Sequence, residues 1–327
     1  MHARSIASAR NTGVRGFALI LLAVLVAAAA GCQESGFDER RETSRPLKVQ
    51  HALGETKVPG QAERPMTLTI DALDDTLALG VRPIRAALPG GRLPAYLRSR
   101  ARGVEVVAPI TQLDLAATDA ADPDVILGSA LRQRGLYNRL SGIAPTVMTD
   151  AGGVQWKLNV RLHGEALGRT NDAEELLIDY DRRAARMRRQ LGRGARGAQV
   201  SVVQVTPREV RVAGLDSFPG SILGDLGLSH PRSQKGAREY QTVAPSRIPV
   251  LDGDMVLLAV APGAAAALHR LEANPAWRRL RAVRSGRVLR VDGGTWWSGG
   301  GIVAARAALR DVTRAFRPRA RAATSGR

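Results

Sequence analysis

The residue with the clearest chemical role in the sequence is a cysteine. Cys32 is the sole cysteine of the chain, and the small residues Ala29, Ala30 and Gly31 come directly before it. This order is typical of a lipobox, where signal peptidase II cuts and the new N-terminal cysteine receives a lipid. No second thiol is present with which Cys32 could form a disulfide inside the chain. The sequence therefore predicts lipidation at Cys32.

The segment before this cysteine has the layout of an export signal. Three arginines and no acidic residue precede an apolar run from Gly16 to Gly31. That run is shorter than the roughly 20 apolar residues of a membrane-spanning helix, so residues 1–31 read as a signal peptide. The alternative is an ordinary signal peptide followed by an incidental cysteine. We expect a lipid-anchored protein of the cell envelope, at the outer face of the plasma membrane or in the periplasm.

Two adjacent tryptophans are the next candidates for function. Trp296 and Trp297 lie between glycines in the segment GGTWWSGGG. A flat apolar ring suits a bulky ligand, and we expect Trp296 to face one while at least one of the two rings packs in the core. Trp277, in the phrase NPAWRRL, reads as a core residue.

The sequence gives little support for a catalytic site or for direct binding of a metal ion. Ser129 stands in LGSA without the flanking glycines of a nucleophile elbow. The five histidines are scattered, whereas a zinc or manganese site needs three or four clustered ligands. We therefore expect a protein that is not an enzyme, has no cofactor and holds no metal directly.

The charge of the chain is strongly positive. It carries 48 basic and 30 acidic residues, a formal net charge of +18. The basic residues are dispersed and aromatic residues are few, which argues against a nucleic-acid partner because such sites cluster both on one element. A basic surface suits anionic lipid headgroups or an anionic ligand.

The elements that must position these residues alternate between strands and helices. Short apolar runs, such as residues 124–127 and 255–261, are separated by helical patterns, which predicts an α/β protein with parallel sheets. One long helix is expected over residues 172–191, with Asn171 as its N-cap, acidic residues at its start and arginines towards its end. At 1.5 Å per residue it is about 30 Å long and can connect two lobes.

These patterns divide the chain into six segments. We expect a signal peptide (1–31), a lipidated N-terminus and flexible tether (32–63), a first lobe (64–171), a connecting helix (172–191), a second lobe (192–316) and a basic tail (317–327).

Six phrases, in order along the chain, carry a family resemblance. They are TLTIDALDDTLALGVRPI from Thr67, DPDVILGS from Asp122, IAPTV from Ile143, WKLNVRLHGEALGR from Trp156, RVAGLDSFPGSILGDLGL from Arg211 and ANPAWRRLRAVRSGRVLRVDGGTWWSGGG from Ala273. Together they resemble the iron-siderophore substrate-binding lipoproteins of ABC transporters, the periplasmic-binding-protein-like class with a helical backbone, and especially the actinobacterial and mycobacterial binders. The resemblance implies two Rossmann-like lobes joined by one long backbone helix, with the ligand cleft between the lobes.

The same resemblance implies which residues line that cleft. The ligand-binding candidates are Trp296, Phe218, Trp156, Tyr137, Ser129 and Arg132. An arginine after the Gly128–Ser129 turn can meet an anionic chelate; the alternative for Arg132 is a solvated helix face.

The resemblance also implies a ferric siderophore as ligand and an ABC permease as partner. Relatives dock to the permease through a glutamate on each lobe, but Ala116 and Gly224 occupy those positions here. Asp114 and Asp225 stand nearby as substitutes. We expect a monomer that captures a ferric siderophore for import. The alternatives are a haem or corrinoid binder of the same fold, or an envelope interaction protein that is not coupled to a permease.

Overall fold

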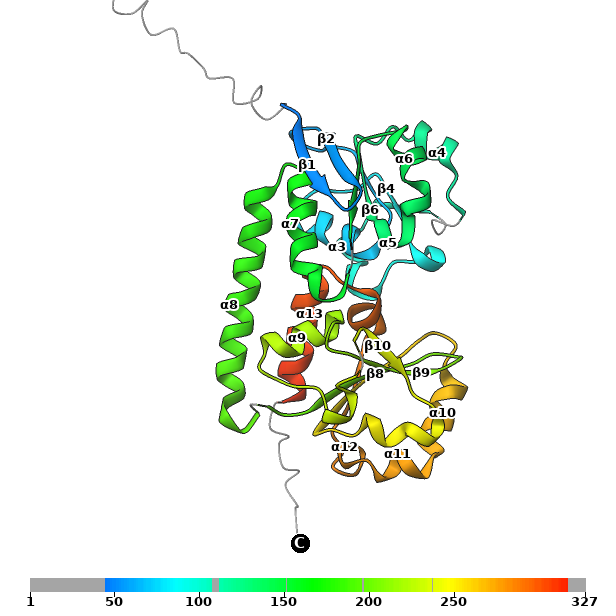
Figure 1. Ribbon diagram of the computed structural model, residues 1–327, viewed down its shortest axis with the longest axis vertical. Coiled ribbons are helices and arrows are strands. Elements are labelled where there is room, and N and C mark those ends of the chain that lie inside the picture. Colours follow the sequence, from blue (N-terminus) through cyan, green and yellow to red (C-terminus); the bar gives the residue numbers. More distant parts are fainter. Residues whose placement is uncertain (1–44, 108–111, 151, 196, 237, 317–327) are drawn as a thin grey trace, which may run out of the picture. The chain divides into compact units, whose positions relative to one another are not determined.

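The structure is a computed structural model that describes residues 45–107, 112–150, 152–195, 197–236 and 238–316. The signal peptide, Cys32 and the basic tail lie outside the described residues. The described residues belong to one compact unit, in which two five-stranded sheets define a first and a second lobe (Figure 1). This arrangement is the α/β, two-lobed fold that the sequence predicts.

The first lobe is built on a parallel sheet. Its order is β5 (Glu105–Val107), β4 (Arg85–Ala87), β3 (Pro65–Thr67), β6 (Val125–Ser129) and β7 (Thr146–Thr149). Its helices are α3 (Ile70–Ala78), α4 (Leu115–Ala120), α5 (Ala130–Gln133), α6 (Tyr137–Ser141) and α7 (Trp156–Ala166), with short turns η1 (Pro89–Gly91), η2 (Ala95–Leu97), η4 (Arg134–Leu136) and η5 (Gly153–Gln155). The Thr69 side chain accepts a hydrogen bond from the Ala72 N–H and caps α3, and Gly80, at φ +77°, lies just beyond its end.

A hairpin extends this lobe towards the N-terminus. Strands β1 (Leu47–His51) and β2 (Gly54–Val58) pair antiparallel, and the Thr56 hydroxyl donates to the Thr146 carbonyl of β7 at 3.1 Å. The flexible tether expected to reach residue 63 is therefore folded over residues 47–58. The sequence pattern does not predict these strands, because each contains only one fully buried residue, Val49 or Val58, among mostly polar neighbours.

One long helix, α8 (Thr170–Ala195), leads to the second lobe. Gly192, at φ +67°, interrupts its helical geometry, so the regular part ends near the expected residue 191. The helix begins at Thr170, so Asn171 lies inside it and is not the expected N-cap. α8 packs against α7 and against the last helix, α13 (Ile302–Ala315) (Figure 1). Ion pairs such as Lys157–Asp181 at 2.8 Å and Arg161–Glu174 at 2.6 Å join α7 to α8.

The second lobe has a mixed sheet. Its order is β10 (Tyr240–Thr242), β9 (Val210–Ala213), β8 (Val200–Val205), β11 (Met255–Val260) and β12 (Val288–Val291), with β8, β11 and β12 parallel and β9 and β10 joined antiparallel. The remaining elements are α9 (Phe218–Asp225), α10 (Ala265–Ala273), α11 (Pro275–Arg279), α12 (Arg281–Arg284) and the turns η6 (Arg232–Gln234), η7 (Pro245–Leu251) and η8 (Gly294–Ser298).

The hydrophobic core does not stop at the boundary between the lobes. One cluster of buried residues contains Leu73 and Trp156 of the first lobe, Val202 and Ile222 of the second, and Leu309 of α13. Separate clusters fill the outer layer of each lobe. The lobes are therefore joined by continuous apolar packing as well as by α8.

Candidate ligand-binding site

On the sheet of the second lobe, one arginine stands between two aromatic rings. The Arg211 Cζ lies 5.0 Å from the ring centroid of Tyr240 and 5.7 Å from that of Trp297. Both distances fall within the cation–π range of about 6 Å. Arg211 and Tyr240 come from the paired strands β9 and β10, while Trp297 comes from η8. Three elements thus bring a cation and two flat rings together.

Polar neighbours orient this arginine. The Arg211 Nη2 donates to the Gln204 Oε1 at 2.8 Å, and its Nε lies 3.3 Å from the Glu209 Oε1. The Arg211 side chain is still 26% exposed, and Tyr240 is 51% exposed. A fixed guanidinium that remains accessible can donate charge-assisted hydrogen bonds to an anion.

The η8 turn places this group at the junction with the first lobe. η8 packs against η2, and a Cβ added to Gly294 would lie 3.2 Å from the Cβ of Pro94. Pro94 belongs to the loop that follows β4, and in open α/β sheets ligands bind beyond such strand ends. Arg211, Tyr240 and Trp297, which we call the aromatic–arginine group, therefore lie where a ligand between the lobes would be reached.

The lobes also touch at the turn before α7. The Val154 N–H donates to the Asp216 carbonyl at 3.2 Å, and the Trp156 Nε1 donates to the Ser221 Oγ at 3.0 Å. The Trp156 ring is fully buried, at 4.9 Å from Tyr180 and 5.8 Å from Phe218, both edge-on. Phe218 is 5% exposed. The structure thus brings two predicted ligand contacts together, but as part of the core.

The two adjacent tryptophans take opposite environments. Trp296 is fully buried and its Nε1 donates to the Asp311 Oδ2 at 2.9 Å, whereas Trp297 is half-buried beside Arg211. The structure therefore gives Trp296 the core role and its neighbour the accessible one, the reverse of the sequence expectation. Which ring enters the core depends on how η8 packs against α13, where Trp296 finds Asp311, and a residue pattern does not show this packing.

The remaining first-lobe candidates differ in exposure and in hydrogen-bond partners. Ser129 ends β6 and is buried, and its N–H donates to the Gln133 Oε1 at 2.7 Å. Arg132 is exposed on α5. The Tyr137 hydroxyl lies 3.4 Å from both the His51 Nε2 and the Thr56 Oγ1. Tyr137 therefore packs on the N-terminal hairpin, away from the aromatic–arginine group.

Both aspartates considered for permease docking have local partners. The Asp114 Oδ1 accepts from the Ala117 N–H at 3.1 Å and caps α4. Asp225, at the end of α9, accepts from the Tyr180 hydroxyl at 2.9 Å and pairs with Lys157 at 3.0 Å. Burial lowers the pKa of Lys157, but the Asp181 and Asp225 carboxylates outweigh it and raise that pKa. A docking role for Asp114 or Asp225 stays a prediction.

A buried polar cluster lies where α13 begins. The side chains of Asp74 and Asp75 on α3 are completely buried, and His163 of α7 is 1% exposed with its Nδ1 2.7 Å from the Asp75 Oδ2. Burial raises the pKa of Asp75. Burial lowers the pKa of His163, but the hydrogen bond and the charge of Asp75 outweigh this and raise it.

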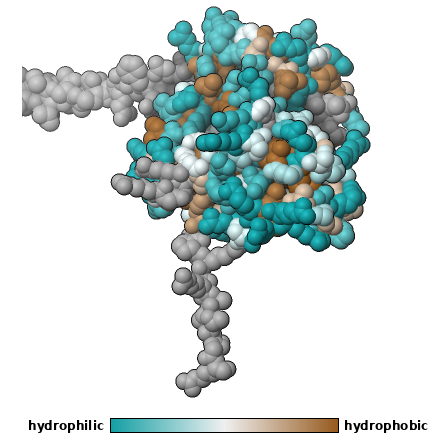
Figure 2. Space-filling view, turned by 60° about the horizontal axis from the view of Figure 1, so that its bottom comes forward, coloured by the Kyte–Doolittle hydropathy of each residue, from teal (hydrophilic) through white to brown (hydrophobic). Residues whose placement is uncertain are grey.

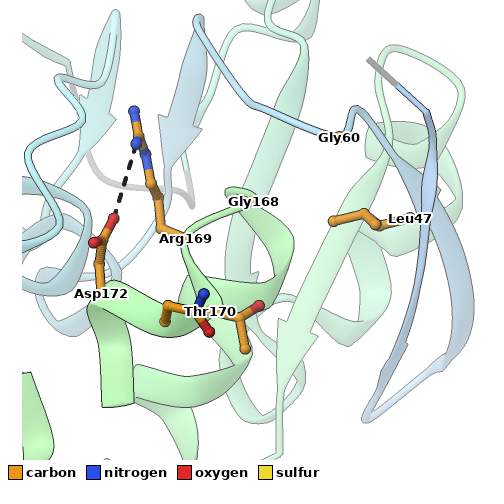
Figure 3. A pocket seen from close by; sticks show the side chains of 7 residues that line it. Leu47, Gly60, Gly168, Arg169, Thr170 and Asp172 are labelled. Carbon is orange, nitrogen blue, oxygen red and sulfur yellow. Dashed lines mark ion pairs between the residues drawn. The ribbon is translucent and has the colours of Figure 1, made fainter. Parts of the chain in front are cut away.

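A separate hollow of about 300 Å³ lies at the start of α8, and Figure 3 shows the residues that line it. Its lining residues are Leu47, Gly60, Gly168, Arg169, Thr170, Asn171 and Asp172. The Arg169 guanidinium already faces Asp172, with Nη1 and Oδ2 3.8 Å apart. This hollow belongs to the hairpin side of the first lobe and contains no residue of the aromatic–arginine group.

Within the described ranges, no three histidine, cysteine, aspartate or glutamate side chains gather closely enough to hold a metal ion. No helix among the same residues is both long and apolar enough to cross a membrane. Figure 2 shows a largely hydrophilic face with separate apolar patches, and the large apolar side chains exposed on the molecule are Leu131, Val154, Leu158, Ile178, Leu215 and Tyr240.

Known proteins are similar to this chain in sequence and in fold. The probable siderophore-binding lipoprotein YfiY of Bacillus subtilis is 31% identical over 91% of this chain and 96% of its own length. The achromobactin-binding periplasmic protein of Dickeya dadantii is 34% identical over 77% of this chain and 86% of its own. The Staphylococcus aureus protein SirA, solved with staphyloferrin B, matches 82% of this chain and 98% of its own, with a TM-score of 0.74 and 26% identity.

The family of the chain follows from these comparisons. The Periplasmic binding protein family model matches residues 92–293, a range that contains most of both sheets and the whole of α8. Family and relatives are substrate-binding proteins. The chain belongs to the Periplasmic binding protein family.

Proposed function

We propose that this protein is an extracytoplasmic receptor that captures a ferric siderophore between its two lobes for import by an ABC transporter. The observation that carries the proposal is the aromatic–arginine group, in which Arg211 is held 5.0 Å from the Tyr240 ring and 5.7 Å from the Trp297 ring at the lobe junction. Such a group offers positive charge and flat apolar surface in one place, as an anionic organic chelate requires.

The named relatives support this ligand class. YfiY is named for siderophore binding, the Dickeya protein for achromobactin, and a further relative, 26% identical over 82% of this chain, for Fe(3+) dicitrate. Ferric citrate is an anionic carboxylate chelate, and a guanidinium pairs well with carboxylates. We infer that Arg211 reads the negative charge of the chelate while Tyr240 and Trp297 cover its organic frame. The iron then needs no ligand from the protein.

The first lobe supplies the opposite wall. Ser129 ends β6 at the carboxyl edge of the sheet, and α5 follows it directly with the exposed residues Leu131 and Arg132. None of the ion pairs among the described residues involves Arg132, so we take its charge to be available to a ligand. We propose Ser129 and Arg132 as first-lobe contacts; Trp156, Phe218 and Trp296 act as the packed support beneath the site.

Attachment to the membrane and delivery to a permease complete the proposal. Lipidation of Cys32 would keep the receptor at the membrane surface, and the tether runs from there to the hairpin that begins at Leu47. Asp114 and Asp225 would meet the permease. A second candidate function, ligand binding without coupling to a permease, is favoured by the local partners that both aspartates already have.

Tryptophan fluorescence gives the decisive test. The mature protein is titrated in parallel with ferric citrate, a ferric tris-catecholate, haem and cobalamin. We expect saturable quenching by at least one ferric chelate and none by cobalamin. Quenching by haem or cobalamin alone would assign the fold to that ligand instead. No response to any of the four would contradict the receptor proposal.

A further inference from the structure

The last helix of the chain has no cap of its own. Gly301 occupies the N-cap position of α13 and offers no side chain. The first N–H groups of a helix need acceptors from outside the helix. Here the acceptors come from α3: the Val303 and Ala304 N–H groups donate to the two carboxylate oxygens of Asp74 at 2.7 and 3.0 Å, and the Ile302 N–H donates to Asp75 at 2.9 Å.

The two carboxylates reach α13 across a large separation in sequence. Asp75 and Ile302 are 227 residues apart, and both aspartates are completely buried. A buried carboxylate is costly unless hydrogen bonds and charges compensate it. The positive end of α13 and the His163 side chain at 2.7 Å supply that compensation.

Gly301 makes this close approach possible. A Cβ added at Gly301 would lie 2.5 to 2.6 Å from the carboxylate and Cβ atoms of Asp74. At the neighbouring Gly300, an added Cβ would meet only the Cβ of Asp71, at an ordinary 3.4 Å. Two adjacent glycines thus differ sharply in what they tolerate.

The segment fixed by this contact is the one that carries Trp297. η8 ends three residues before the N-cap glycine, and the Trp296 Nε1 donates to Asp311 on α13 at 2.9 Å. A Cβ on Gly299 would lie 2.7 Å from the Cβ of Ala304. η8 is therefore bound to α13 both by its exit and by its buried tryptophan.

We propose that Asp74 and Asp75 are positioning residues for ligand recognition: from the first lobe they set the first turn of α13 and, through it, the place of Trp297 beside Arg211. This inference rests on the proposed function for its effect on ligand affinity. It assigns a positioning role to two completely buried carboxylates. It also explains why charged groups are kept in an otherwise apolar junction.

The test compares variants on both sides of the contact. Asp74→Asn keeps the size of the side chain but replaces one acceptor oxygen with a donor, and Gly301→Ala displaces the contact without changing any charge. Gly300→Ala is the matched control for Gly301→Ala. Asn274→Ala, which removes the cap of α11 in the outer part of the second lobe, is the control for a simple loss of stability.

Two readouts are needed. Hydrogen exchange of the amides of residues 294–304 reports the position of η8 without a ligand, and ferric citrate titration reports binding. We expect Asp74→Asn and Gly301→Ala to raise exchange in this segment and to weaken ferric citrate binding about tenfold. Gly300→Ala and Asn274→Ala should change neither readout, even if Asn274→Ala lowers the melting temperature.

Unchanged exchange at residues 294–304 in both variants would overturn the positioning role. Raised exchange with unchanged affinity would overturn the link to ligand recognition. If the wild-type protein binds no ferric chelate, the proposed function fails, and the exchange measurement alone still decides whether Asp74 fixes η8.

Discussion

The two lobes present different kinds of surface to the space between them. The first lobe has an entirely parallel sheet, so its candidate contacts, Ser129 and Arg132, stand at and just after a strand end. The second lobe adds the antiparallel pair β9–β10, and Arg211 and Tyr240 lie along those strands. Parallel strands offer loops to a ligand, whereas an antiparallel edge offers a flat row of side chains. This difference agrees with the proposal that the second lobe recognises the charge of the ligand.

The first prediction tests this comparison by substituting the two tryptophans of η8 one at a time. Trp296→Ala should lower the free energy of unfolding by about 3–5 kcal/mol, because it empties a fully buried site. Trp297→Ala should cost much less stability but weaken ferric citrate binding. Urea unfolding and chelate titration of both variants measure this. Loss of binding in a stable Trp296→Ala protein would return the ligand contact to Trp296.

The second prediction compares one arginine from each lobe. Arg211→Gln should weaken ferric citrate binding about tenfold to a hundredfold, the value of a charge-assisted hydrogen bond. Arg132→Gln, on the exposed α5, should weaken it less than about threefold. Isothermal titration at low and high salt measures both. Equal losses of affinity in the two variants would show that both lobes recognise the charge of the ligand.

The third prediction concerns the buried junction of the lobes. The pKa of His163 is raised in the folded protein, so the stability from its pairing with Asp75 is fully present below about pH 6.5. That stability, about 1 kcal/mol for one hydrogen bond, is lost as the pH rises through the folded value. Urea unfolding of wild type and His163→Asn between pH 5.5 and 8.5 tests this. Burial lowers the pKa values of His51 and His230, but both proteins contain these residues and their effect cancels. A stability difference that grows with pH would contradict the prediction.

The smallest expected effect separates the docking aspartates of the two lobes. Asp114→Ala should cost about 1 kcal/mol of stability through loss of the α4 cap, while Asp114→Asn should cost only a few tenths. Asp225→Asn, by contrast, weakens the pairing with Lys157. Thermal unfolding gives the stabilities, and iron uptake in cells gives the function. Normal uptake with both asparagine variants would remove these carboxylates from permease docking.

The sequence predicted the framework better than the site. Alternating apolar strands and the charge pattern of α8 are local signals, and the elements form where these signals stand. The roles of Trp296 and Trp297 depend on one turn of π-helix, and the exposure of Phe218 and Trp156 depends on packing between lobes. Such information is not local. In the sequence, Arg211 is recognisable as a charged residue between two valines of β9. Its aromatic partner Tyr240 becomes apparent only from the pairing of β9 with β10.

The cap of α13 also has a consequence for the order in which the protein folds. The acceptors for the first N–H groups of α13 belong to α3, near the start of the folded unit, whereas α13 is the final helix among the described residues. His163 pairs with Asp75 within the first lobe, but Asp74 accepts hydrogen bonds from two backbone N–H groups of α13, so those bonds form only when the end of the folded unit is in place. A chain truncated before Ile302 would lack them and would leave η8 without the helix that supports it. The contact between α3 and α13 therefore ties the beginning of the folded unit to its end.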